Sequence, residues 1–164
     1  MKVIENFLSK KDFEHLKYIL IDSYTFPWYY NPITIGTQKE KKNELFFTHN
    51  FLYDKNKVSS FYSIINPIVN KIKSLENVNE FTRIKGNFYL FQNKKIKHEK
   101  HTDQDYKHKV ALYSLSTTNG FLTIGNKKIK DMQNQCIIFD GSLEHYATTQ
   151  TDTKERVNIN FNYV

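Results

Sequence analysis

The chain has 164 residues, of which 39% are hydrophobic and 25% are charged. That length fits one domain, 1–164, and that composition excludes a disordered chain. The single cysteine, Cys136, excludes a disulfide framework, and no apolar run is long enough to span a membrane, so we expect a cytoplasmic protein.

The net charge of +7 and the pI near 9.3 raise the question of an acidic partner such as nucleic acid. The excess is nearly all lysine, spread along the chain together with many Asn and Ile. This mixture is typical of a compositional bias, and we favour that interpretation. Nucleic acid remains the alternative partner.

Two helices are predicted in the first half of the chain. Ser9 has the form of an N-cap, and apolar residues at helical spacing follow it, which predicts a helix near residues 10–22. A second apolar stripe at helical spacing runs through residues 58–75. Within it, Pro67 predicts either a kink or a second helix start after Asn66.

The stretch 23–50 is rich in aromatic residues but is interrupted by two prolines and a glycine. We expect no long regular element here. The aromatic rings could form a lid over a substrate, or they could attach the N-terminal helices to a sheet. We slightly favour the second interpretation and assign no role to His49.

After Asn77 the chain consists of short segments rich in β-branched and aromatic residues, separated by turn signals. They predict strands at 83–91, 109–115, 121–124, 127–132, 135–139, 145–148 and 155–163. We therefore expect an α+β, mainly β fold: a jelly roll over 79–164, with helices and a candidate lid in 1–78 packed on one of its sheets.

One pair of side chains in this region has the spacing of a metal site. In an extended segment, His101 and Asp103 project to the same face, and His145, just after a predicted strand, can supply a third ligand. Two histidines and one carboxylate form the ligand set of non-haem Fe(II) oxygenases. Zinc is the rival metal, but no glutamate lies at the helical spacing of a metalloprotease.

The last predicted strand alternates strictly between two kinds of residue. One face carries Arg156, Asn158, Asn160 and Asn162, and the other carries Val157, Ile159, Phe161 and Tyr163. The apolar face is expected to pack on a protein layer, while the polar face meets solvent or a bound dicarboxylate, which a guanidinium can grip in a bidentate way. The chain has two arginines against 22 lysines, so the general abundance of basic residues does not explain why position 156 is an arginine.

Taken together, His-x-Asp, the distal His145 and Arg156 resemble the pattern of the Fe(II)/2-oxoglutarate-dependent dioxygenases. The resemblance covers roughly residues 83 to 164 and is nearest to the small prolyl-4-hydroxylase-like enzymes of phage and marine bacteria. The pairs Asn87/Tyr89 and Arg156/Asn158 are similar to co-substrate contacts of the AlkB-like branch. The sequence departs from both branches. AlkB-like enzymes have a second arginine on this strand, and Asn162 occupies its position here. The Tyr and Gly spacing that animal prolyl hydroxylases have ahead of His-x-Asp is also absent.

The resemblance implies a double-stranded β-helix that binds Fe(II), 2-oxoglutarate and O2. It implies Fe(II) ligands at His101, Asp103 and His145, and co-substrate contacts at Arg156, Asn158, Asn87, Tyr89 and, with less support, Tyr113. The implied reaction is hydroxylation of a C–H bond with release of succinate and CO2. The expected substrate is a protein or peptide residue such as proline, or else a small molecule.

Two other functions compete with this expectation. One is an AlkB-like oxidative demethylase or hydroxylase of nucleic acid, in keeping with the basic composition. The other is a non-catalytic jelly-roll binding module, which would have no need of three metal ligands and an arginine.

Overall fold

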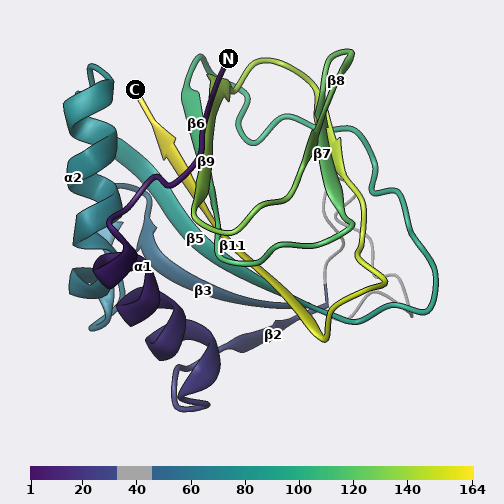
Figure 1. Ribbon diagram of the computed structural model, residues 1–164. Helices are drawn as coiled ribbons and strands as arrows, with labels where there is room; N and C mark the ends of the chain where they lie inside the picture. Colours follow the sequence, from purple (N-terminus) through teal and green to yellow (C-terminus); the bar gives the residue numbers. More distant parts are fainter. Residues whose placement is uncertain (33–45) are drawn as a thin grey trace.

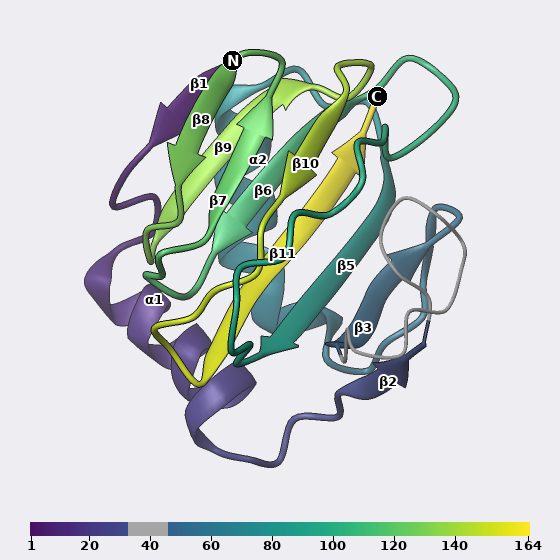
Figure 2. The same cartoon turned by 90° about the vertical axis from the view of Figure 1, so that its right-hand side faces the viewer.

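Two antiparallel sheets face each other in the computed structural model, which describes residues 1–32 and 46–164 (Figures 1 and 2). The larger sheet has the order β1 (Lys2–Ile4), β9 (Gln135–Asp140), β6 (Lys109–Ser114), β11 (Glu155–Tyr163), β5 (Phe81–Leu90), β3 (Phe46–Tyr53) and β2 (Tyr29–Asn31), with β4 (Asn56–Lys57) paired to β3. The smaller sheet has the order β10 (His145–Ala147), β7 (Phe121–Ile124) and β8 (Lys127–Lys130). This arrangement confirms the predicted jelly roll.

Two helical segments cover the outer face of the larger sheet (Figure 1). The first, α1 (Lys10–Lys17), begins at Ser9, whose hydroxyl accepts a hydrogen bond from the Asp12 backbone N–H at 3.2 Å, and it continues through a π-helical turn to Asp22. The second, α2 (Asn66–Leu75), follows a short 3-10 turn. The predicted helix over 10–22 and the predicted second start near Asn66 are confirmed.

The predicted helix over 58–75 begins too early. Residues 58–61 lie outside any helix, and the chain is helical from Tyr62 onward. Pro67 explains the change of helix type, because its fixed φ and missing N–H suit the first turn of an α-helix and not its interior.

Two hydrophobic cores lie on the two sides of the larger sheet. The first fills the space between that sheet and the helices and includes Leu16, Ile68 and Ile72 with Ile159 and Phe161 from β11. The second lies between the two sheets and consists of Val110, Leu112, Leu122, Ile124, Ile137 and Phe139. The larger sheet is thus buried on both faces, which leaves the polar face of β11 inside the sandwich.

Strand β3 was not anticipated, because the stretch 23–50 was expected to be irregular. It pairs along its length with β5, and the register shifts between Asn50 and Leu52. That bulge breaks the period of two by which a strand is recognised in sequence.

The aromatic residues before β3 attach the N-terminal segment to the sheet. The indole of Trp28 donates a hydrogen bond to the Leu20 carbonyl at 3.0 Å, and the ring of Phe26 packs against Phe51 on β3. These contacts agree with the favoured interpretation of the stretch. The central part of the candidate lid, 33–45, lies outside the described residues.

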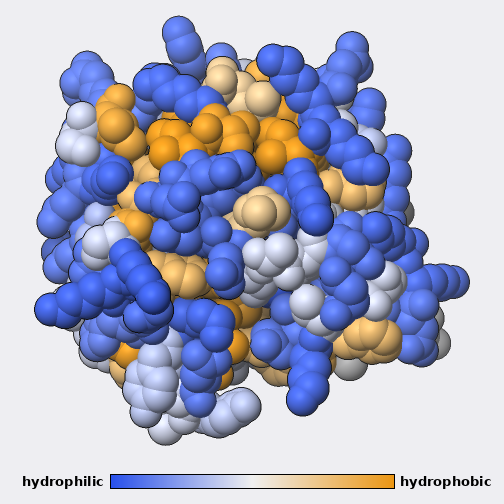
Figure 3. All heavy atoms as spheres, in the orientation of Figure 1, coloured by the Kyte–Doolittle hydropathy of each residue, from blue (hydrophilic) through white to orange (hydrophobic). Residues whose placement is uncertain are grey.

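The surface is largely hydrophilic on the face seen in Figure 3, with a hydrophobic band near the top of the view, between the two sheets. None of the helices in the described part of the chain is long and apolar enough to cross a lipid bilayer.

Candidate metal centre

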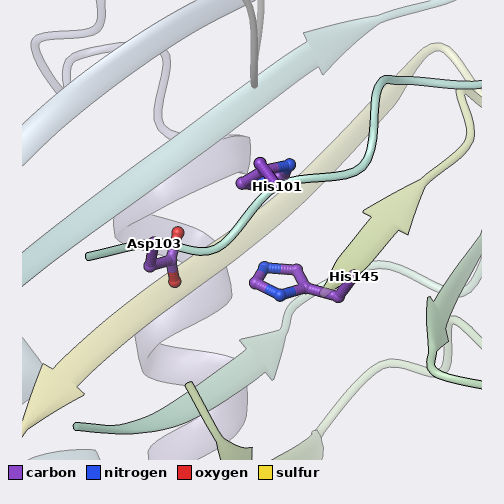
Figure 4. Close-up of side chains that lie close together, drawn as sticks. All are labelled: His101, Asp103 and His145. Carbon is purple, nitrogen blue, oxygen red and sulfur yellow. The ribbon is translucent and has the colours of Figure 1, made fainter. Parts of the chain in front are cut away.

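The three predicted ligands lie close together (Figure 4). One ligand atom from each of His101, Asp103 and His145 can be chosen so that all three lie within 4.8 Å of one another. His145 begins β10, while His101 and Asp103 come from the coil between β5 and β6. The structure therefore brings together, from two distant segments, a set of donors suited to a divalent metal.

Backbone hydrogen bonds fix the two histidines side by side. His101 and His145 exchange both of their backbone N–H···O hydrogen bonds at 3.0 Å, and their ring centroids are 4.6 Å apart. The Nδ1 of His101 bonds the Glu99 carbonyl at 3.1 Å, and the Nδ1 of His145 bonds the Leu143 carbonyl at 3.0 Å. Because Nδ1–H is used as the donor in both rings, each Nε2 has a lone pair for a metal.

The carboxylate of Asp103 is held by three side chains from the floor of the pocket. Arg83 donates to Oδ1 at 3.2 Å, while the Asn160 and Asn162 amides donate to Oδ2 at 2.8 Å and 3.0 Å. Burial by itself raises the pKa of Asp103, but Arg83, His145 and the two amides outweigh it and lower the pKa to about 2. The carboxylate is therefore ionised at neutral pH.

The pKa of His101 is lowered, mainly because burial disfavours its charged form. The hydrogen bond to the Glu99 carbonyl opposes this effect, and the nearby His145 adds to it. The imidazole is then neutral at neutral pH, which is the form that binds a metal.

The pocket floor is a ladder of paired polar residues from β5 and β11. Cross-strand pairing sets Tyr89 opposite Arg156, Asn87 opposite Asn158, Lys85 opposite Asn160, and Arg83 opposite Asn162. The predicted polar face of β11 is thus turned into the sandwich, where Arg156, Asn158 and Asn162 are buried. All four of the predicted co-substrate contacts on these strands, Arg156, Asn158, Asn87 and Tyr89, line the pocket that contains the three candidate metal ligands.

Arg156 lies at the end of the ladder away from Asp103 and already has an acidic partner. Its Nε is 2.5 Å from the Asp131 carboxylate, its Nη1 donates to the Thr148 carbonyl at 2.9 Å, and its guanidinium lies 5.5 Å from the centre of the Tyr89 ring. The side chains of both Arg156 and Asp131 are almost completely buried. Asp131 follows β8 and was not singled out in the sequence.

Asn87 and Asn158 bond each other, with the Asn87 amide donating to the Asn158 carbonyl oxygen at 2.9 Å. Tyr89 stacks on Phe46 of β3 at a centroid distance of 5.3 Å. These residues lie in the same pocket as Arg156 and the three candidate metal ligands.

The expectation for Tyr113 was wrong. Its side chain lies on the opposite face of the larger sheet, where it is fully buried against Phe7 and its hydroxyl donates to Asn134 at 2.9 Å. The neighbouring Leu112 lines the pocket instead. Since β6 is apolar on both faces, its sequence does not reveal which face meets the site.

Other histidines have structural surroundings. His49 is buried between Pro27 and Ser59, whose oxygens lie 2.8 Å and 2.7 Å from its ring nitrogens. His108 is buried beside Gly141, at the turn that precedes β10. His98 is buried and packs against Tyr89.

Sequence reasoning did not single out Arg83 and Lys85, and it assigned no individual role to Asn160 and Asn162. A signal was present, because Arg83, Lys85, Asn87 and Tyr89 alternate with apolar residues or glycine, as the polar face of β11 does. Two such strands that pair with each other indicate one shared polar surface.

By sequence, no protein-family model matches the chain, and a search of curated proteins finds no match. Solved structures do resemble it. A prolyl hydroxylase from Trichoplax adhaerens, in complex with a hypoxia inducible factor oxygen degradation domain peptide fragment, superposes with a TM-score of 0.72 at 13% identity, over 99% of this chain and 82% of that chain.

Two bacterial proteins resemble the chain as well. An oxidoreductase of the 2OG-Fe(II) oxygenase family from Burkholderia pseudomallei gives a TM-score of 0.61 at 13% identity, over 87% of this chain and 76% of that chain. A prolyl-4-hydroxylase from Pseudomonas putida gives 0.58 at 9% identity, over 99% and 91%. At these identities the comparison establishes a common fold, which is the one that the sequence resemblance implied.

Proposed function

We propose that the chain is an Fe(II)- and 2-oxoglutarate-dependent dioxygenase that hydroxylates a C–H bond. The observation that carries this proposal is the single pocket that contains His101, Asp103 and His145 together with Arg156. A binding module without catalysis would have no need of this combination.

The donor set fits Fe(II). Two imidazoles and one carboxylate are the ligands of non-haem Fe(II) oxygenases, and in each of the three side chains here another polar atom is held by the protein. The same donors also suit zinc. The cations Arg156 and Lys85 in the same pocket favour the oxygenase, because they match an anionic co-substrate that a zinc hydrolase does not use.

Fe(II) bound here would activate O2, with 2-oxoglutarate supplying two electrons as it is converted to succinate and CO2. The chain's own contribution is positional. We infer that Arg156 and Asn158, which line the pocket, hold the far end of the co-substrate. The hydrogen bonds from Arg83, Asn160 and Asn162 to Asp103, called the Asp103 clamp below, keep that carboxylate in a fixed orientation. Leu112 and Leu122 form an apolar wall that limits access of water to the pocket.

A peptide residue such as proline is the substrate that we propose. A cavity of about 620 Å³ adjoins the metal pocket and shares Arg83 and Asp103 with it. Its walls include the exposed rings of Tyr53 and Tyr106, which offer contact area for an extended chain. The Trichoplax adhaerens prolyl hydroxylase of the same fold holds a peptide fragment.

The test of the reaction class is an anaerobic titration of metal-free protein with Fe(II) and 2-oxoglutarate. We expect a visible charge-transfer band that disappears in His101→Ala and persists in His15→Ala, which removes an exposed histidine of α1. The double change Arg156→Met with Asp131→Asn avoids leaving one buried charge alone, and it should weaken 2-oxoglutarate binding. If no band forms while zinc binds through the same residues, the proposal fails.

The substrate is tested separately by succinate release under air. Proline-containing peptides should stimulate release above the uncoupled rate. The rival nucleic-acid substrate predicts stimulation by single-stranded DNA or RNA instead, with an affinity that falls steeply as salt rises.

A further inference from the structure

Lys85 is a cation of the metal pocket for which the proposed reaction names no specific bound group. It lies on the pocket face of β5, between Arg83 and Asn87, and it pairs across the sheet with Asn160. Asn160 holds the metal ligand Asp103. Lys85 is therefore at the metal end of the ladder, four residues along β5 from Tyr89, which faces Arg156.

The other charges of the pocket are paired with each other. Arg83 pairs with Asp103 at 3.2 Å, and Arg156 pairs with Asp131. The ammonium of Lys85 makes no hydrogen bond or ion pair with any residue in 1–32 or 46–164. Lys85 thus contributes the one positive charge among these described pocket residues that has no neutralising partner.

An unpaired, partly buried cation destabilises the folded protein unless an anion binds next to it. A partly buried ammonium loses hydration, and here the neighbouring guanidinium of Arg83 repels it as well. Burial first, and Arg83 second, lower the pKa of Lys85 to about 8, although Asp103 opposes them. A lysine kept only for solubility would extend its ammonium into water and would not line a pocket.

We propose that Lys85 binds a carboxylate of a ligand at the metal end of the pocket. The inference rests on the proposed function, since it assumes a divalent metal at the three ligands. With Fe(II) and doubly charged 2-oxoglutarate bound, and with both ion pairs neutral, Lys85 leaves one positive charge in the pocket. An acidic group on the substrate would neutralise that remaining charge. The other source is the metal-bound carboxylate of 2-oxoglutarate, which Lys85 would then share with the metal.

The test measures binding and does not depend on turnover. Mn(II) replaces Fe(II), and calorimetry gives the dissociation constant of 2-oxoglutarate for the wild type, Lys85→Met and Lys85→Arg. A second titration adds acetate to the Mn(II) protein with and without saturating 2-oxoglutarate. Lys127→Met is the matched control, because it removes the same charge from an exposed position on β8.

If the co-substrate is the source of the carboxylate, Lys85→Met weakens 2-oxoglutarate binding about tenfold or more, and Lys85→Arg restores most of it. If the substrate is the source, 2-oxoglutarate binds Lys85→Met normally, but acetate binding to the 2-oxoglutarate complex, present in the wild type, is lost. Lys127→Met changes neither.

The inference is overturned if Lys85→Met binds both 2-oxoglutarate and acetate as the wild type does, or if acetate does not bind and 2-oxoglutarate binding is unchanged. A wild-type protein that binds no 2-oxoglutarate would refute the proposed function, and acetate binding to the Mn(II) protein would still decide the role of Lys85.

Discussion

Asp103 is bound by more protein side chains than its proposed role as a single metal ligand requires. Arg83, Asn160 and Asn162 all donate to it, and all three project from the paired strands β5 and β11. Partners of this kind orient a ligand and tune its basicity, and their loss typically lowers metal affinity. The site is therefore built into the most extensively paired part of the sheet.

This arrangement predicts a difference between two asparagines on the same face of β11. Asn162→Leu removes a donor to Asp103 and should weaken Mn(II) binding about 10-fold or more, as losses of such partners do. Asn158→Leu is the control, because Asn158 bonds Asn87 and does not touch Asp103. Calorimetric titration without 2-oxoglutarate measures both. Equal losses in the two variants would contradict the role of the Asp103 clamp.

His101 predicts how the metal-free protein responds to acid. Its pKa is lowered in the folded state from the ordinary 6.5, so below that pH the unfolded chain binds more protons than the folded one. Its contribution to the free energy of unfolding therefore falls as the pH drops below 6.5 through the lowered pKa.

The check is urea unfolding of the wild type and His101→Gln between about pH 7 and about pH 5. The wild type should lose stability relative to the variant as the pH falls. His15→Gln, at an exposed position, should not change the profile in the same way; if it does, the effect does not come from the burial of His101.

At the scale of elements, the turn between β9 and β10 positions His145. Gly141 in this turn donates its backbone N–H to the His108 carbonyl at 2.9 Å, and a Cβ at position 141 would clash with the His108 ring, at 2.1–2.4 Å from three of its atoms. The glycine is required by this close approach and not by its backbone angle.

Gly141→Ala should therefore destabilise the protein by about 1–3 kcal/mol, as overpacking does, and should weaken Mn(II) binding by displacing His145. Adding His108→Ala removes the clash, so the double variant should be more stable than the sum of the single changes predicts. Thermal unfolding with and without Mn(II) measures both effects. Simple additivity would show that the contact with His108 is not the cause.

At the scale of the whole molecule, the larger sheet separates two hydrophobic cores that contribute differently to stability and to the site. The core under the helices determines stability, while the core between the sheets also supports the site. Ile72 of α2 belongs to the first, and Phe139, whose ring lies 5.1 Å from that of His145, belongs to the second.

Ile72→Ala should lower the free energy of unfolding by about 2–5 kcal/mol, the usual range for a buried isoleucine, and leave the Mn(II) affinity of the folded protein unchanged. Phe139→Ala should cost about 3–5 kcal/mol and also weaken Mn(II) binding, because His145 loses the ring that packs against it. Denaturant unfolding measures the effect on stability, and metal titration measures the effect on Mn(II) affinity. A loss of Mn(II) affinity in Ile72→Ala would refute the different roles of the two cores.

The sequence alone determined the order of the strands after Asn77 and the identity of the candidate metal ligands. Strands 121–124 and 155–163 and the first helix could be predicted because their periodicity is a local property of the chain. His101, Asp103, His145 and Arg156 could be selected because a motif is defined by residue type and spacing, whatever the tertiary contacts.

Only the tertiary structure decided which side chains share the pocket and what they bind there. The pairing of Arg156 with Asp131, the Asp103 clamp and the unpartnered Lys85 all depend on the register of β5 against β11 and on where β8 ends. Tyr113 and β3 were misjudged for related reasons, since a strand buried on both faces and a strand with a bulge lack a readable alternation. Contacts between distant residues depend on how strands pair, and the period of a single strand does not carry that information.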